Sequence, residues 1–154
     1  MDIRVVEGDL LTQHVEVIVN AWNRNIIPWW LLLPQGVSKA IKRHAGYQPF
    51  IEVGRHGAIA LGHAVLTSAG RSQFKAIIHV AGISMWWVAS SKSIQDSVRS
   101  AMALVNQHGF ESVAFPMIGA GTGGFNEAAV LALIQQTLAE IESPAVVYLV
   151  LYRA

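Results

Sequence analysis

The sequence predicts an α/β protein built as a three-layer α/β/α sandwich. Short runs rich in β-branched residues alternate with longer segments in which apolar residues return every three or four positions. The runs Val17 to Val19 and Ala76 to Val80 are almost continuously apolar, which indicates strands that helices cover on both faces. A length of 154 residues suits one domain with a single core, spanning residues 1 to 154.

Strands are predicted where Val and Ile are frequent and where Gly, Pro or Asn stand at the boundaries. In chain order they are Ile3 to Val6, Val15 to Asn20, Ala64 to Ser68, Ala76 to Val80, Ser112 to Met117 and Ala145 to Tyr152. Helices are predicted where the spacing of apolar residues is helical and where Ser or Asn stands at the start. These are Ser38 to His44, Ser91 to His108 and Asn126 to Ile141.

Composition excludes several classes of protein. A net charge of +1 gives no electrostatic reason to expect nucleic acid, and the absence of cysteine excludes disulfides, a thiol nucleophile and zinc-thiolate sites. The first residues are acidic where a signal peptide is basic and then apolar, which favours a cytoplasmic protein. The longest apolar run, Ile26 to Leu33, contains Pro28 and is too short to span a membrane. The histidines show no metal-ligand spacing, so we expect neither a metal nor a cofactor.

A glycine-rich connection between a predicted strand and a predicted helix is the strongest functional signal. It contains Gly119, Gly121, Gly123 and Gly124, so that backbone N–H groups are free to point into one concavity beside a helix N-terminus. Phosphate is the expected ligand of such a turn. Its late position argues against a dinucleotide-binding Rossmann unit, and the lack of a following Lys-Ser or Lys-Thr excludes a Walker A loop. The alternative is a tight connection that merely needs small residues.

Two further motifs carry polar side chains at the ends of predicted strands. Asn20 and Asn23 lie where strand ends commonly form a ligand crevice, and their amides suit ribose hydroxyls. Asp9 follows the first strand, and its carboxylate suits an exocyclic amine such as that of adenine. The alternatives are that the asparagines organise the following loop and that Asp9 caps a local turn.

Taken in order, these motifs resemble those of a macrodomain, the ADP-ribose-binding fold. The segments Gly8 to Leu10 and Ile18 to Asn23 resemble the Gly-Asp-Ile and Ile-Val-Asn-Ala-Ala-Asn motifs of that family. Gly36-Val37, the helix ending in Ala45-Gly46, the segment Ile77 to His79 and the segment Phe115 to Phe125 continue the likeness over nearly the whole chain. The resemblance implies a mixed central sheet and a site for ADP-ribose or an ADP-ribosylated substrate.

The resemblance also implies a role for each part of the site. Asp9 would hold the adenine amino group and Tyr152 would stack on the base, while Asn20 and Asn23, the candidate catalytic residues, would face the distal ribose. The diphosphate would lie between two segments. Its predicted contacts, together with those of the neighbouring motifs, are Leu10, Ala21, Trp22, Gly36, Val37, Ser38, Gly119, Ala120, Gly121, Thr122, Gly123, Gly124 and Phe125.

The sequence departs from the family in the first phosphate loop. Hydrolytic members commonly have Val-Asp after three glycines, whereas this chain has Ser38 at the position of the aspartate. No Asp or Glu occurs from Val17 to Phe50, so that segment offers no carboxylate as a general base. We interpret Ser38 as a helix N-cap rather than a nucleophile, and His79 as a core histidine. Water activated by a substrate phosphate, or by His44 or His63, remains as an alternative.

A second departure is aromatic. The segment 26–34 contains Ile, Pro, Trp and Leu where glycine and polar residues are usual, Trp22 replaces a small residue, and Met85-Trp86-Trp87 precedes the long helix. Such segments are too apolar to stay in water without a partner. Three interpretations stand: a lid over the distal ribose, a contact between copies in a homo-oligomer, or a cap on the core.

Two functions from different classes follow. The first is an enzyme that hydrolyses a group on the distal ribose of ADP-ribose: an acyl ester, a protein-linked ADP-ribosyl bond or a terminal phosphate. The second is a non-catalytic ADP-ribose-binding module. A free-standing domain favours the enzyme, and the acid-free first loop favours the module. An RNA-binding or structural domain of the same fold is disfavoured by the near-neutral charge.

Overall fold

The computed structural model describes residues 1–23, 36–57, 59–83, 90–120 and 125–153. Within these residues a six-stranded sheet has the order β1-β6-β5-β2-β4-β3. Strand β3 is antiparallel to β4, and the other neighbouring pairs are parallel, so the expected mixed sheet is confirmed. The bounds are β1 (Asp2–Gly8), β2 (Val17–Asn23), β3 (Ala64–Thr67), β4 (Ala76–Ile83), β5 (Ser112–Phe115) and β6 (Val146–Tyr152).

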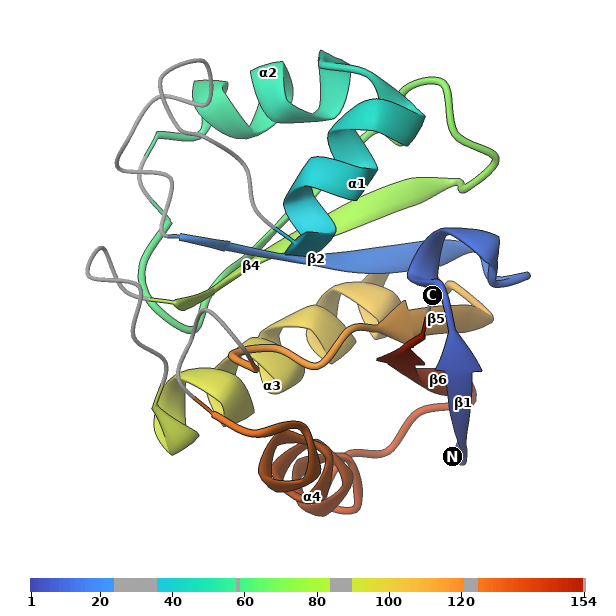
Figure 1. Cartoon of the computed structure of the whole chain (residues 1–154), viewed down its shortest axis with the longest axis vertical. Helices are drawn as coiled ribbons and strands as arrows, with labels where there is room; N and C mark the ends of the chain where they lie inside the picture. Colours follow the sequence, from blue (N-terminus) through green and yellow to red (C-terminus); the bar gives the residue numbers. More distant parts are fainter. Residues whose placement is uncertain (24–35, 58, 84–89, 121–124, 154) are drawn as a thin grey trace.

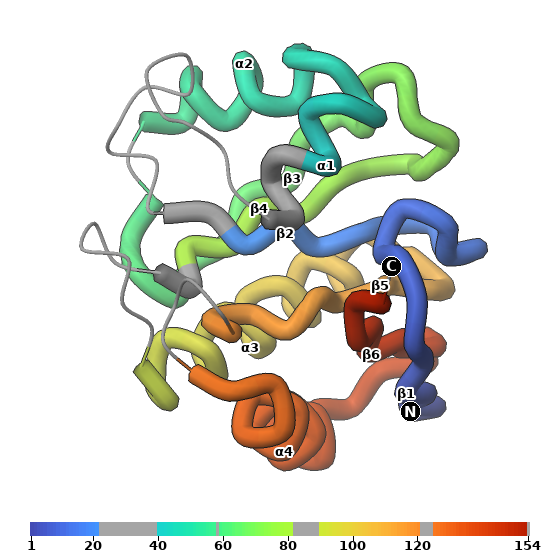
Figure 2. The backbone as a smooth tube through the Cα atoms, viewed as in Figure 1, coloured from blue at the N-terminus to red at the C-terminus, as the bar shows by residue number. Residues whose placement is uncertain are grey.

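Helices cover both faces of this sheet. Helices α1 (Gly36–Ala45) and α2 (Gln48–Arg55) lie on one face, and α3 (Ser91–His108) and α4 (Glu127–Leu138) lie on the other (Figure 1). The first and last strands, blue and red in Figure 2, lie side by side although they are far apart in the sequence. The predicted three-layer α/β/α sandwich is therefore confirmed.

The uninterrupted apolar runs of the central strands are explained by this double cover. On β2, Val17 and Val19 pack in the cluster that α3 and α4 complete, whereas Ile18 packs in the cluster that contains Ile41 of α1 and Phe50 of α2. Successive side chains of a strand point to opposite faces, so a strand between two helical layers has no polar face.

The ends of the two longer helices follow their sequence signals. A capping box joins Ser90 and Ser93 at the start of α3, and Gly109 ends that helix with φ 70°. Asn126 caps α4, as predicted, because its side chain accepts a hydrogen bond from Ala129 N at 2.8 Å. The helix ends at Leu138 rather than Ile141, since the N–H groups of Glu140 and Ile141 bond three residues back in turns.

The structure corrects the prediction at the other helices. Helix α1 begins at Gly36, so Ser38 lies inside its first turn and the N-cap interpretation of Ser38 is wrong. Helix α2 was not predicted, because its cap residue Tyr47 is not a usual N-cap and makes no side-chain cap bond, although Pro49 in the first turn is compatible with a helix start. Burial of Pro49, Phe50 and Val53 supports this short helix in the absence of a side-chain cap.

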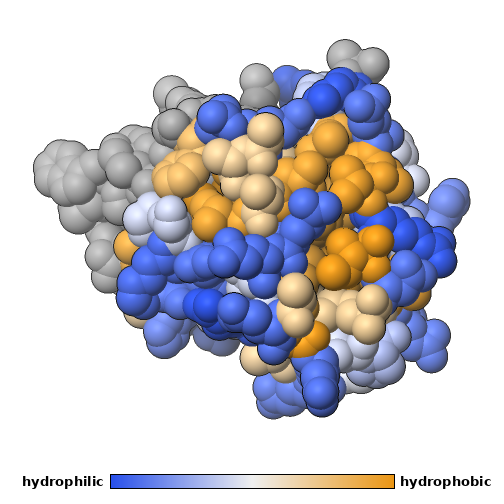
Figure 3. Space-filling model, turned by 90° about the horizontal axis from the view of Figure 1, so that it is seen from below, coloured by the Kyte–Doolittle hydropathy of each residue, from blue (hydrophilic) through white to orange (hydrophobic). Residues whose placement is uncertain are grey.

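The face that includes α4 shows hydrophobic side chains among hydrophilic ones (Figure 3). Helix α4 buries Val130, Ile134 and Leu138 against the sheet, while its outward positions include the exposed small residues Ala128 and Ala132. Apolar content is therefore not confined to the core side of this helix. Across the described ranges of the chain, no helix combines the length and the apolar character needed to cross a membrane.

Candidate functional site

The predicted site residues meet at one edge of the sheet. Strands β1, β6, β5, β2 and β4 are parallel, so their carboxyl ends lie on the same side. Ligand crevices in open α/β sheets form at this edge. It receives Asp9 after β1, the backbone of Asn23 at the end of β2, the glycine-rich connection after β5, and Tyr152 at the end of β6.

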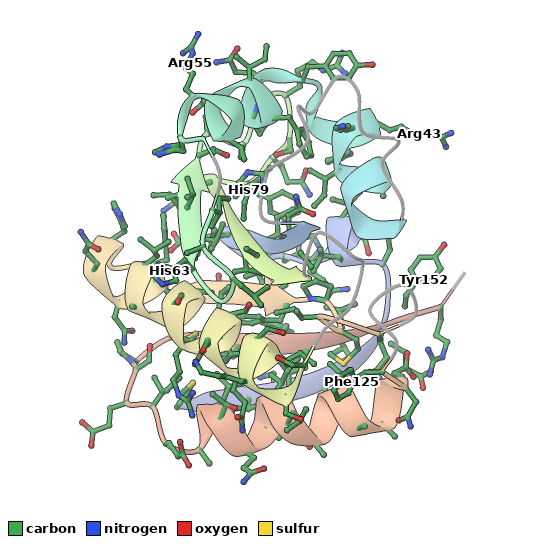
Figure 4. The ribbon with its side chains drawn as sticks, turned by 90° about the vertical axis from the view of Figure 1, so that its left-hand side faces the viewer. Arg43, Arg55, His63, His79, Phe125 and Tyr152 are labelled. Atoms are coloured by element: carbon green, nitrogen blue, oxygen red, sulfur yellow. The ribbon has the colours of Figure 1, made fainter. Side chains whose placement is uncertain are left out.

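The β1–β6 corner, formed by Gly8, Asp9, Tyr152 and Arg153, is held together by the backbone. Gly8 and Tyr152 are partners in the parallel ladder, and Arg153 N donates a hydrogen bond to Gly8 O at 3.0 Å. The Tyr152 side chain is 66% exposed, which leaves a ring face available to a ligand (Figure 4). The corner therefore brings Asp9 and Tyr152 to the ends of two neighbouring strands, and neither residue is buried in the core.

Asp9 also has the structural role that we gave as its alternative. Its Oδ1 accepts a hydrogen bond from Leu11 N at 2.9 Å and so caps the short 3₁₀ helix η1 (Leu10–Thr12). Leu10 is only 5% exposed and belongs to the core, so its buried side chain anchors this turn to the rest of the protein. A carboxylate has two oxygens, and capping with Oδ1 is compatible with acceptance of a further hydrogen bond by Oδ2.

The base of the glycine-rich connection is closed by its own backbone. Gly119 has φ 83°, a conformation that favours glycine, and its carbonyl accepts a hydrogen bond from Phe125 N at 3.1 Å. Ala120 and Phe125 form an isolated parallel bridge, and both side chains pack against the main core. The predicted contacts Gly121 to Gly124 lie outside the described residues.

An exposed ion pair joins the end of β6 to the start of α4. Arg153 Nη2 lies 2.9 Å from Glu127 Oε1, and Glu127 stands in the first turn of α4. The hydrogen bond from Arg153 lowers the pKa of Glu127, and the same bond raises the pKa of Arg153. The pair ties the two elements that flank the edge, although exposed pairs contribute little to stability.

A second group of polar side chains is buried between β2, β4 and β3. Asn20 and His79 are both 0% exposed, and Asn20 Nδ2 lies 3.1 Å from His79 Nδ1. His79 Nε2 lies 2.8 Å from Thr67 Oγ1 (Figure 4 labels His79). Burial lowers the pKa of His79 to about 3, so its ring is neutral near pH 7. The interpretation of His79 as a core histidine is confirmed.

Lys42 is a buried cation that the sequence did not single out. It is 9% exposed on α1, and its Nζ lies 4.8 Å from the centroid of the Phe50 ring. Burial lowers the pKa of this amine. The rings of Phe50 and His79 meet edge to face, with their centroids 5.7 Å apart. The contact of Lys42 with Phe50 depends on α2, which the sequence analysis did not predict.

For some of the remaining predicted contacts the structure describes the backbone alone, and others lie outside the described residues. Gly36, Val37 and Ser38 form the first turn of α1 rather than a loop, which keeps the N–H groups of a helix N-terminus near the edge. Ala21 is half-buried on β2, and the register of β2 against β4 shifts between Ala21 and Asn23. The side chains of Trp22, Asn23, Val37 and Ser38, and the Trp-rich segments 26–34 and 85–87, lie outside the described residues.

Of the two histidines considered as bases, His44 lies away from this edge, because its Nε2 lies 2.7 Å from Gln73 Oε1, before the amino end of β4. His63 precedes β3, and its carbonyl accepts a hydrogen bond from Ala81 N at 3.0 Å, so its backbone lies toward the carboxyl end of β4. The adjacent Gly62 O accepts a hydrogen bond from Ser100 Oγ of α3 at 2.6 Å (Figure 4 labels His63). An open hollow of about 800 Å³ near His44 is lined by residues 45–48, 68–71, 74 and 75, at the opposite end of the sheet from Tyr152. Within the described ranges, no three His, Asp or Glu side chains are grouped as metal ligands.

Comparison with known proteins shows which family and which relatives this chain is similar to. Residues 19–134 match the family model described as Macro domain. The O-acetyl-ADP-ribose deacetylase of Enterobacter sp. (strain 638) is 35% identical over 162 residues, covering 97% of this chain and 86% of that protein. The protein of the same name from Escherichia coli (strain K12) is 34% identical over 161 residues, covering 97% of this chain and 88% of that protein.

Solved structures give the same relationship in three dimensions. A macrodomain mutant of Oceanobacillus iheyensis with ADPR superposes with a TM-score of 0.82 at 25% identity, covering 95% of this chain and 82% of that chain. The Trypanosoma brucei macrodomain in complex with ADP-ribose has a TM-score of 0.77 over 96% of this chain and 63% of that one. At 21% identity the second likeness concerns the fold alone.

Proposed function

This chain belongs to the macrodomain family, and we propose that it binds ADP-ribose or a derivative of it and hydrolyses a group attached to the distal ribose. The observation that carries the proposal is the shared edge. Asp9, the base of the glycine-rich connection and Tyr152 lie at the carboxyl ends of parallel strands. An elongated ligand with a base, a diphosphate and a second ribose needs contacts in that order along one edge.

Each part of the edge suits one part of the ligand. The exposed ring of Tyr152 offers a stacking face to adenine, and Asp9 Oδ2 accepts from its exocyclic amine. The connection from Gly119 to Phe125 holds the diphosphate with backbone N–H groups, opposite the first turn of α1. Asn23 ends β2 at this edge and would face the distal ribose, whereas Asn20, which we expected to face it too, is fully buried beside His79 and supports the strand from the interior.

An acyl ester is the group that we favour for hydrolysis. Two relatives that align with nearly all of this chain carry the name O-acetyl-ADP-ribose deacetylase. Ester hydrolysis requires a positioned water, and an amide that both donates and accepts is suited to orient one. With Ser38 in place of the family's aspartate, we expect the substrate's own phosphate to assist the attacking water.

A non-catalytic binding module is the second candidate, and one observation favours it. The segment from Val17 to Phe50 has no carboxylate, and the next one along the chain, Glu52, accepts hydrogen bonds from Ser68 N and Ser68 Oγ. Glu52 is therefore engaged on α2 and β3 rather than available at the end of β2.

The experiment that separates the two candidates is a substrate panel measured beside binding. We expect calorimetric binding of ADP-ribose and release of acetate from O-acetyl-ADP-ribose, with slower or no turnover of ADP-ribosylated protein and of a terminal phosphate. Binding without turnover of any of the three substrates supports the module. If millimolar ADP-ribose produces no calorimetric heat and no thermal shift, both candidates are contradicted.

Asn23→Ala tests the assignment of the distal ribose. The substitution removes an amide proposed to act in the reaction, so we expect kcat to fall by about tenfold to a hundredfold while the Kd for ADP-ribose changes by less than about threefold. Asn25→Ala, two positions further along the sequence at a residue that is not among the predicted contacts, serves as the control. Equal effects of the two variants would place the reacting group elsewhere.

A further inference from the structure

A series of hydrogen bonds links the middle of β2 to α2. We call it the Asn20 network; it comprises Asn20, His79, Thr67, Ser68 and Glu52. Asn20 Nδ2 lies 3.1 Å from His79 Nδ1, and His79 Nε2 lies 2.8 Å from Thr67 Oγ1. Thr67 Oγ1 donates to Ser68 O at 3.0 Å, and Ser68 N donates to Glu52 Oε1 at 3.0 Å.

The directions of the bonds at His79 follow from the orientation of the Asn20 amide, whose nitrogen faces the ring. An amide nitrogen donates and does not accept, so in this orientation His79 Nδ1 is the unprotonated acceptor. The proton of the neutral ring is then on Nε2, which donates to Thr67 Oγ1, and the hydroxyl proton of Thr67 goes to Ser68 O. With this orientation of the Asn20 amide, the network selects one tautomer of His79.

The surroundings keep His79 neutral. It is 0% exposed, and its ring and that of Phe50 meet edge to face. The negative charge of Glu52 favours protonation and the positive form of His56 opposes it, but burial is the larger effect and the pKa falls to about 3. Lys42 lies over the same Phe50 ring and adds a further cation nearby. A neutral ring can remain the acceptor for Asn20 throughout the physiological pH range.

The bond between Asn20 and His79 lies where the pairing of two strands becomes irregular. Asn20 pairs with His79 and Ala21 with Val80, and the register then shifts before Asn23 meets Ile83. Backbone ladder bonds alone hold a strand end less firmly beyond such an irregularity. A buried side-chain bond at the last regular pairs therefore anchors the segment that ends in Asn23.

We propose that His79 is a positioning residue for the candidate site: as the acceptor for Asn20 it holds the end of β2, and with it Asn23, in the geometry that turnover requires. This inference rests on the proposed function, since turnover is one of its readouts. His79 does not contact the ligand or exchange a proton with it, because it is fully buried and both ring nitrogens are engaged within the protein.

Two isosteric variants separate this role from a general contribution to folding. In His79→Asn, the amide oxygen takes the position of Nδ1 and can still accept from Asn20, but the bond to Thr67 is lost. In His79→Gln, the amide nitrogen takes the position of Nε2 and can still donate to Thr67, but the acceptor for Asn20 is lost. Each variant gives up one hydrogen bond at the same buried position, so each is the control of the other.

We expect kcat to fall by about tenfold to a hundredfold in His79→Gln and by less than about threefold in His79→Asn, with similar free energies of unfolding and similar Kd for ADP-ribose in both. Equal losses of kcat that follow the losses of stability would overturn the proposal, and so would wild-type kcat in His79→Gln. The split between the variants is the result that a purely structural role does not produce.

A measurement without turnover keeps the proposal separate from the proposed function. In wild-type protein, ¹⁵N NMR should show an unprotonated Nδ1 in His79 and a side-chain amide of Asn20 that exchanges slowly with solvent. The slow exchange should persist in His79→Asn and disappear in His79→Gln. An inactive wild-type protein with this pattern contradicts the proposed hydrolysis alone, whereas a protonated Nδ1, or unchanged amide exchange in His79→Gln, contradicts the positioning role.

Discussion

The two halves of the sheet's carboxyl edge satisfy their polar groups in different ways. At the β1–β6 corner and the base of the glycine-rich connection, the backbone is anchored by ladder and turn bonds while Tyr152 stays 66% exposed. In the Asn20 network, Asn20 and His79 are fully buried and the side chains bind one another. The first arrangement leaves groups available for a ligand, and the second holds a strand end in place. We therefore expect substitutions in the first half to change affinity and those in the second to change turnover.

Among the variants that test this comparison, we expect the largest effect on ADP-ribose binding from a negative charge at the base of the glycine-rich connection. Asp and Asn tolerate positive φ better than other side chains, and Gly119 has φ 83°. Gly119→Asp should weaken the binding of ADP-ribose by about a hundredfold, because a like charge beside the diphosphate costs several kcal/mol. Isothermal titration calorimetry measures this change.

Gly119→Asn is the matched control, since it adds nearly the same atoms without the charge. We expect it to weaken binding by about tenfold or less, and the difference between the two variants should shrink as salt concentration rises. Equal affinities of the two variants at low salt would mean that the diphosphate does not lie against Gly119.

A smaller loss of affinity is expected at the exposed aromatic ring of the corner. Tyr152→Ala should weaken ADP-ribose binding by about tenfold, because stacking of a base on an aromatic side chain is worth about 1–3 kcal/mol. Tyr152→Phe keeps the ring and should bind within about threefold of wild type. Intrinsic fluorescence or calorimetric titration gives both values, and kcat for the acyl ester should be unchanged at saturation.

The second exposed tyrosine provides a control at the other end of the sheet. Tyr47 is 61% exposed beside the open hollow near the amino end of β4. Tyr47→Ala removes a ring of similar exposure, and its affinity for ADP-ribose should equal that of wild type. If Tyr47→Ala lowers the affinity for ADP-ribose and Tyr152→Ala does not, the adenine base binds in the hollow.

The exposed half of the edge was more accessible to sequence reasoning than the buried half. Gly8-Asp9 and the glycines from Gly119 onwards stand next to strands and a helix whose order follows from local patterns. Each of these motifs is local, so the sequence alone identifies it. The neighbourhood of Gly8 and Tyr152 is not local, because it requires the pairing of β1 with β6.

The Asn20 network, in contrast, depends on pairings that no local pattern specifies. Asn20 and His79 are 59 positions apart, and their bond requires the register of β2 against β4. Thr67 joins through an antiparallel strand, and Glu52 joins through α2, whose start has no side-chain cap. The sequence indicated that His79 is a core residue, but its partners follow only from the assembled sheet.

The smallest predicted effect comes from the titration of this buried ring. Its pKa is about 3 in the folded protein and about 6.5 when unfolded, so between these values the unfolded chain binds the extra proton. The free energy of unfolding is therefore unaffected by this ring well above pH 6.5. It decreases as the pH falls through 6.5, by about 1 kcal/mol between pH 6.5 and 5.5. Urea unfolding of wild type and of His79→Asn at the two values isolates this contribution, because the carboxylates titrate in both proteins. The decrease in stability should be about 1 kcal/mol smaller in the variant; identical decreases would mean that His79 becomes protonated within the fold, which would break its bond from Asn20 and remove the contrast between the two halves of the edge.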